Sequence, residues 1–189
     1  CHDLAHQHDV RAQNPGYRWC HGMNFFEDLR LGERRELGSH TFTAEDIKAF
    51  AIRYDPQAFH VDEEAAARSH FGALCASGWH TGAVCMRLIV LANQREAQAQ
   101  RARGEEVPNL GPSPGVRDLR WHKPVFAGDT ISYALEIKEL REASRPGYGL
   151  VVSQTTGTNQ AGDLVYSVLG AVFVERRRKP HNAGAARGV

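Results

Sequence analysis

The chain has 189 residues, of which 42% are apolar and 24% charged, and its formal net charge is +1. A single domain of this length buries well over half of the surface that its unfolded form exposes, so one core is sufficient. The apolar content and the near-neutral charge argue against an intrinsically disordered chain and against a surface built to bind a polyanion.

Cysteine spacing and hydropathy favour a reducing compartment and argue against a membrane span. The cysteines are Cys1, Cys20, Cys75 and Cys85, and no two of them have the spacing of a metal-binding pair or a disulfide framework. The longest apolar stretch, 83–92, is interrupted by Arg87 and is far shorter than the roughly 20 residues that cross a bilayer. We therefore expect a cytoplasmic protein with no metal site, no nucleic-acid partner and no membrane contact.

The two ends of the chain differ from its middle in composition. Residues 1–22 are polar, contain several histidines and lack the apolar core of a signal peptide, so we expect them to be disordered or extraneous to the fold. A zinc site among their histidines and cysteines is an alternative, although the spacing matches no recurring ligand pattern. Residues 177–189 are basic and then rich in Gly and Ala, which is typical of a flexible tail. The sequence thus predicts one domain over residues 23–176.

The first helix is predicted over residues 44–54. Thr43 and Asp46 have the spacing of a capping box, and apolar residues recur on one face of the turns that follow. Pro56 ends this helix, because a proline pushes the residue before it, Asp55, toward an extended backbone. A second short helix is expected after Asp62, with glutamates near its positive N-terminal dipole.

A longer helix, predicted from Trp79 through Ala92, is apolar on nearly every side. Such a helix must be enclosed by protein. Ser77 is its expected N-cap and Gly78 its first residue, so the N–H group of Gly78 has no partner within the helix. Residues 94–106 are predicted to be a frayed extension that passes into a loop.

The second half of the chain has the two-residue period of β-strands, and turn signals at Pro146-Gly147 and Gly162-Asp163 separate its segments. Helices followed by antiparallel strands indicate an α+β domain in which the sheet wraps around the apolar helix. The strands are expected at 36–42, 115–123, 130–137, 150–158 and 164–174.

A carboxylate and an imidazole lie five residues apart around the proline that ends the first helix. On a continuous helix Asp55 and His60 would point about 140° apart, and on a flat strand they would point to opposite faces. Only a bent segment lets both reach one small molecule, and Pro56 favours such a bend. Asp55 alone could be a turn residue and His60 a structural histidine, but their joint placement favours an acid/base pair.

The start of the long helix offers a second group of interest. Free N–H groups and the helix dipole both stabilise negative charge at a helix N-terminus. Gly78 has no side chain to block a ligand carbonyl, although a tight helix start is an alternative reason for the glycine. Ser77 beside it is a candidate substrate-binding residue.

Four segments, NFFEDL (24–29), YDPQAFHVD (54–62), ASGWHT (76–81) and LRWHKPVFAGDT (119–130), resemble the MaoC-like dehydratase family, which includes the (R)-specific enoyl-CoA hydratases. The resemblance implies a hotdog fold, in which an antiparallel sheet wraps one long helix, and a homodimer or a dimer of dimers. By position it implies Asp55 and His60 as the catalytic residues, and Gly78 with Ser77 as the oxyanion or substrate-binding residues.

The reaction implied by this resemblance is the reversible hydration of an enoyl-CoA to a 3-hydroxyacyl-CoA, in fatty acid metabolism, with coenzyme A as part of the substrate and no other cofactor. The chain departs from the hydratase pattern at Gln57, where an asparagine is usual, and at Ser77, where a histidine is usual. These departures bear on the substrate more than on the reaction type. The alternatives are a hotdog acyl-CoA thioesterase and a non-catalytic subunit that binds acyl thioesters.

Overall fold

The computed structural model describes residues 23–177, and the predictions made for residues 1–22 and 178–189 lie outside this range. After a short 3-10 helix, η2 (Phe26–Asp28), the helices are α1 (Ala44–Tyr54), α2 (Ala58–Val61), α3 (Glu63–Ala67) and α4 (Gly78–Ala102). The strands are β1 (Arg34–Thr41), β2 (Gly115–Trp121), β3 (Thr130–Glu142), β4 (Tyr148–Thr158) and β5 (Leu164–Glu175).

The short helices begin and end where local chemistry places them. The hydroxyl of Thr43 accepts the N–H of Asp46 at 3.1 Å, and the carboxylate of Asp62 accepts the N–H of Ala65 at 2.7 Å, which confirms both predicted caps. Asp55 has φ −155° and ends α1 before Pro56 as expected. The single turn α2 was not predicted, because four residues are too few to show a helical period.

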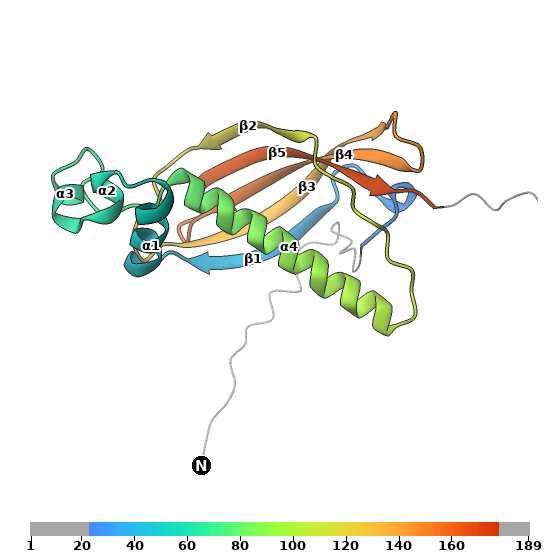
Figure 1. Cartoon of the computed structure of the whole chain (residues 1–189), viewed down its shortest axis with the longest axis horizontal. Coiled ribbons are helices and arrows are strands. Elements are labelled where there is room, and N and C mark those ends of the chain that lie inside the picture. The colour runs from blue at the N-terminus through green and yellow to red at the C-terminus, as the bar shows by residue number, and fades with distance from the viewer. Residues whose placement is uncertain (1–22, 178–189) are drawn as a thin grey trace, which may run out of the picture.

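The strands form one antiparallel sheet in the order β1-β3-β4-β5-β2. All five expected strands are present, and β3 runs beyond the predicted end to Glu142. Figure 1 shows α4 lying across one face of this curved sheet, with α1, α2 and α3 gathered at the N-terminal end of α4. The predicted hotdog arrangement is therefore confirmed.

The core lies between α4 and the concave side of the sheet. Val84 and Leu88 of α4 pack in one cluster with Leu37 of β1 and Tyr133 of β3, and all four are buried. The hydroxyl of Tyr133 donates to the carbonyl of Thr81 at 3.1 Å, so this buried polar group has a partner. This contact fixes the first turns of α4 against the sheet.

One expectation for the long helix is wrong. The helix does not fray after residue 93 but continues to Ala102, because polar side chains on this stretch find partners elsewhere in the fold. Arg35 of β1 donates to Asn93 at 2.6 Å and to Glu96 at 2.9 Å. Gln100 exchanges two 2.8 Å hydrogen bonds with the backbone of Met23.

The helix is also not enclosed on all sides within one chain. An exposed stripe runs along α4, spaced so that its members share one face of the helix. The stripe consists of Trp79, Ala83, Met86 and Val90. In the part of the chain described, no helix is both long and apolar enough to cross a membrane.

Candidate active site

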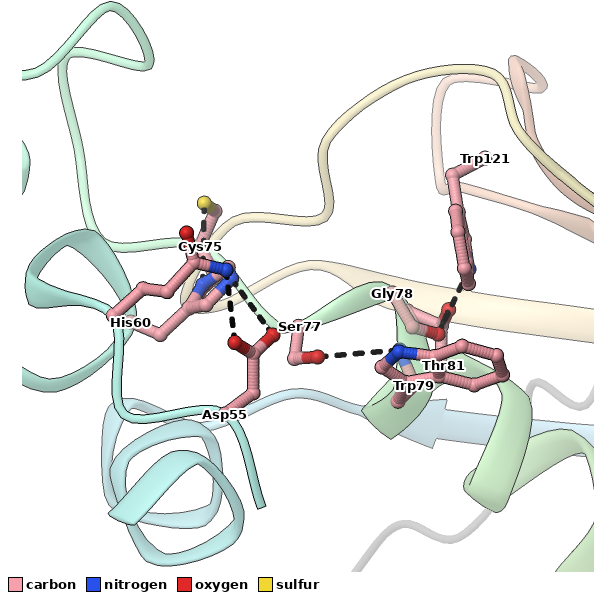
Figure 2. Close-up of polar contacts among 9 residues, drawn as sticks. Asp55, His60, Cys75, Ser77, Gly78, Trp79, Thr81 and Trp121 are labelled. Carbon is pink, nitrogen blue, oxygen red and sulfur yellow. Dashed lines mark hydrogen bonds and ion pairs between the residues drawn. The ribbon is translucent and has the colours of Figure 1, made fainter.

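The bend after α1 brings Asp55 and His60 together. Oδ2 of Asp55 lies 3.5 Å from Nε2 of His60. Figure 2 shows the two side chains pointing toward one another. His60 is buried, with 5% of the residue's surface exposed, whereas Asp55 is partly exposed. The predicted convergence of these two side chains on one spot is therefore confirmed, and their catalytic role stays a prediction.

The orientation of His60 is set by a backbone carbonyl. Nδ1 of His60 lies 2.7 Å from the carbonyl oxygen of Cys75. Because a carbonyl can only accept, Nδ1 must carry the proton, and in the neutral imidazole Nε2 is then an acceptor. The ring of Phe59 packs edge-on against the imidazole, with centroids 4.5 Å apart. His60 thus presents a proton-accepting nitrogen toward Asp55.

Asp55 is held in its ionised form. Burial raises the pKa of its carboxyl, but side-chain hydrogen bonds from Ser77 and Gln57 and the attraction of His60 together lower the pKa below its ordinary value. The Gln57 amide donates to Oδ1 of Asp55 at 2.8 Å. Gln57 was identified only as a departure from the family pattern, and no sequence signal predicted this hydrogen bond.

Ser77 connects the acid/base pair to the start of α4. Its side chain is almost fully buried and its hydroxyl accepts the N–H of Trp79 at 3.2 Å, which confirms the predicted N-cap. The same side chain is also one of the groups that lower the pKa of Asp55. Ser77 therefore links the electrostatics of the Asp55 carboxylate to the N-terminus of the long helix.

Gly78 is the first residue of α4, as predicted. Its N–H has no hydrogen-bond partner within residues 23–177, while its carbonyl accepts the Thr81 hydroxyl at 2.6 Å and Nε1 of Trp121 at 2.8 Å. Figure 2 shows this free helix end beside the acid/base pair. The geometry provides an unpaired donor at the position where the sequence predicted one.

The indole of Trp121 gives a second reason for a glycine at position 78. A Cβ atom there would lie 2.6 Å from Cδ2 of Trp121, about 1 Å inside ordinary carbon contact. Trp121 also meets Trp79 edge-on, with ring centroids 5.2 Å apart. The sequence did not single out Trp121 as a site residue, because its strand position does not reveal that it packs against the start of α4.

His80 joins the helix that precedes Asp55 to the helix that begins at Gly78. Its imidazole stacks on the ring of Phe50 in α1, with centroids 4.6 Å apart and planes 5° from parallel. Burial, with the neighbouring His40, lowers the pKa of His80 to about 4, so this ring is neutral at neutral pH. His80 acts as an aromatic packing residue between α1 and α4.

The site offers acid/base groups and a hydrogen-bond donor. Among residues 23–177 no three histidine, cysteine or acidic side chains are grouped so that they could hold a metal ion. Cys75 and Cys85 are buried, and burial raises the pKa of Cys75 to about 11, so its thiol is not a nucleophile at neutral pH. The arrangement can polarise a water molecule next to a donor for negative charge.

Known proteins are similar to this chain in sequence and in fold. The family model for the MaoC like domain matches residues 29–158. The structure is similar to that of a MaoC-like dehydratase from Rhodospirillum rubrum, with a TM-score of 0.70 and 37% identity over 82% of this chain and 99% of that one.

Two curated relatives add to this. A mesaconyl-CoA hydratase from Cereibacter sphaeroides is 41% identical over 71 residues, which are 38% of this chain but only 20% of that protein. A 3-hydroxybutyryl-CoA dehydratase from Methylorubrum extorquens is 27% identical over 61% of this chain and 65% of that protein. Because the family model covers more than half of the chain and the fold is the hotdog fold, this protein belongs to the MaoC-like dehydratase family.

Proposed function

We propose that this protein catalyses the reversible hydration of an enoyl-CoA to a 3-hydroxyacyl-CoA. The observation that carries the proposal is the convergence of Asp55 and His60 beside the unpaired N–H of Gly78. Membership of the dehydratase family and the two CoA-thioester relatives support the same reaction class.

The mechanism follows from the two acceptors that face each other. The Asp55 carboxylate is ionised, and Nε2 of an imidazole whose proton is on Nδ1 has a lone pair, so one water beside them can donate a hydrogen bond to each. As its oxygen adds to Cβ of the enoyl thioester, one O–H bond of the water breaks and its proton passes to the pair, which delivers a proton to Cα. The N–H of Gly78 binds the thioester oxygen, on which negative charge develops.

A panel of enoyl-CoA substrates of varied length and branching tests this proposal. We expect loss of the enoyl absorbance with formation of one enantiomer of the 3-hydroxyacyl product, and no free thiol. Thiol release without hydration would identify the rival thioesterase, in which a carboxylate directs water to the carbonyl carbon. Tight acyl-CoA binding without loss of enoyl absorbance would identify a non-catalytic binding subunit.

The substitution Gly78→Ala tests two reasons for a glycine at position 78, which are packing against Trp121 and access of a ligand to the amide. The added methyl group would overlap the Trp121 indole, so we expect a loss of about 1 to 3 kcal/mol in unfolding free energy. The double variant Gly78→Ala/Trp121→Ala removes this overlap and should recover stability. If the N–H of Gly78 binds the thioester oxygen, the double variant should still turn over about 10²-fold more slowly than the wild type. Denaturant unfolding and hydration rates give both readouts.

Gly82→Ala is the matched control in the same helix. Its Cβ would meet only the Tyr166 side chain, with the hydroxyl at 3.7 Å and Cε2 at 3.8 Å, which are ordinary contact distances. We expect wild-type turnover and unchanged or slightly higher stability, since alanine favours the helix over glycine. Full turnover in the Gly78→Ala/Trp121→Ala protein would show that the glycine is needed only for packing.

We also propose that the protein pairs as a homodimer through the exposed stripe of α4 and the adjoining edge of the sheet. Met86 is 56% exposed and Val90 44% exposed, which is unusual for apolar side chains in a row along one helix face. Strand β2 is an edge strand, and Val116 on it is 62% exposed. In a dimer with twofold symmetry, the same surfaces of the partner subunit would cover both the stripe and the edge strand. Arg87, also exposed and next to Met86, would then face the partner.

Met86→Asp tests the dimer, because it places a charge in the middle of the stripe. We expect sedimentation to shift from dimer to monomer, since burying an unpaired carboxylate at an interface is costly. Leu31→Asp, a substitution at an equally exposed aliphatic residue outside α4, should leave the mass unchanged. A monomeric wild-type protein, or a Met86→Asp protein that remains dimeric, would rule out this surface.

A further inference from the structure

The residues that hold the His60 imidazole in place lie in a separate part of the chain. The carbonyl that accepts Nδ1–H belongs to Cys75, in the extended segment just before α4. Whatever fixes the Cys75 peptide therefore fixes the tautomer and direction of His60.

A short two-stranded ladder holds this peptide. The N–H of Ala76 donates to the carbonyl of Val125 at 2.7 Å, and the N–H of Ala127 donates to the carbonyl of Leu74 at 3.1 Å. Cys75 thus lies opposite Phe126 as a bridge partner. On the side toward α2, the N–H of Cys75 donates to the carbonyl of Phe59 at 3.4 Å.

Asp129 closes the turn that follows this ladder. Its Oδ2 accepts the N–H of Phe126 at 2.8 Å, and its own N–H donates to the carbonyl of Phe126 at 3.0 Å. Gly128, with φ +94°, provides the left-handed residue that such a turn requires. The carboxylate therefore bonds directly to the residue that faces Cys75.

Two other segments secure the turn. Phe42, at the end of β1, exchanges backbone hydrogen bonds of 2.8 Å with Gly128 and Asp129. Gln160, in the loop between β4 and β5, donates to Oδ1 of Asp129 at 2.6 Å and accepts the N–H of Thr130 at 3.0 Å. Both oxygens of the Asp129 carboxylate are thus used, one for Phe126 and one for Gln160.

We propose that Asp129 is a positioning residue for His60, acting through the turn at Phe126 and the carbonyl of Cys75. It touches neither substrate nor the reacting atoms, and its effect is to hold the imidazole as the Nδ1–H tautomer with Nε2 toward Asp55. Its role in turnover rests on the proposed hydration, whereas its effect on the imidazole does not.

Asp129→Ala is expected to lower kcat about tenfold with KM within about twofold, because a slightly misplaced acid/base group affects the chemical step more than substrate binding. In the absence of substrate, nitrogen-15 NMR of the imidazole should show faster solvent exchange of the His60 Nδ1–H and a mixture of tautomers. The resonance is assigned by its loss in His60→Ala. Asp129→Asn keeps an oxygen for the Phe126 N–H and should restore most of both readouts.

Glu175→Ala is the matched control. That carboxylate also accepts a backbone N–H and a side-chain amide, both from Asn109 at 2.7 Å, but at the opposite end of the sheet. We expect no change in the His60 resonance. If Asp129→Ala fails to fold, Gln160→Ala removes only the hydrogen bonds made by Gln160 and should give a smaller change in the same direction.

The proposal is overturned if the His60 Nδ1–H of the folded Asp129→Ala or Gln160→Ala protein exchanges as in the wild type, whatever happens to kcat. If the protein hydrates none of the enoyl-CoA substrates, this result contradicts only the proposed reaction. The imidazole measurement would still decide whether Asp129 positions His60.

Discussion

Replacing Asp55 by asparagine is expected to lower turnover on an enoyl-CoA by about 10² to 10⁴. The substitution keeps the shape of the side chain and the acceptor for the Gln57 amide, but it removes the charge and one of the two acceptors that would hold the water. Initial rates from the loss of enoyl absorbance, with a thermal unfolding curve, measure the effect.

Asp62→Asn is the control for the Asp55 substitution. Asp62 caps α3 through Ala65 and is not part of the acid/base pair. Because asparagine is an equally good N-cap, both turnover and stability should stay near wild type. An Asp55→Asn protein with full turnover would mean that the carboxylate has no part in the reaction.

Replacing His60 by alanine should have an effect of the same order, about 10² to 10⁴ in turnover. The substitution removes the second acceptor for the water and leaves the Cys75 carbonyl without its partner. We expect a stability loss of about 1 to 3 kcal/mol from that buried, unsatisfied carbonyl, which leaves the protein folded. Hydration rates and a denaturant titration separate the two effects.

The double variant sharpens this prediction. If Asp55 and His60 act on one water as a unit, Asp55→Asn/His60→Ala should be little slower than the worse single variant. Additive losses would indicate separate roles instead. His70→Ala, at an exposed histidine that contacts Phe71, should leave turnover unchanged.

Much of the fold was predictable because local chemistry determines it. The caps at Thr43, Asp62 and Ser77 are side-chain bonds to a backbone N–H two or three residues ahead, so a few residues of sequence are enough to predict them. The bend at Pro56 is likewise a local steric effect. The strands followed from alternation, which depends only on which face of the sheet is buried.

The length of α4 was mispredicted, and the part of it that one chain leaves exposed was not predicted, for a physical reason. Residues after 93 are polar, and a polar helix is stable here only because Arg35 and Met23, distant in sequence, supply partners. The exposed stripe follows from the width of the sheet, which covers one side of the helix and leaves Met86 and Val90 bare. The spacing of apolar residues along α4 predicts neither its full length nor its exposed stripe.

The sequence by itself determined that a carboxylate, an imidazole and a bare helix N-terminus belong to one domain, with a proline to bend the chain between the first two. Only the tertiary structure decided which nitrogen of His60 faces Asp55, since the proton is fixed by a carbonyl 15 residues away. Only the tertiary structure showed that the Trp121 indole packs on Gly78 and that Asp129 closes a turn through Phe126. These contacts join segments far apart in the chain, and their directions depend on how the sheet packs against α4, which no local pattern encodes.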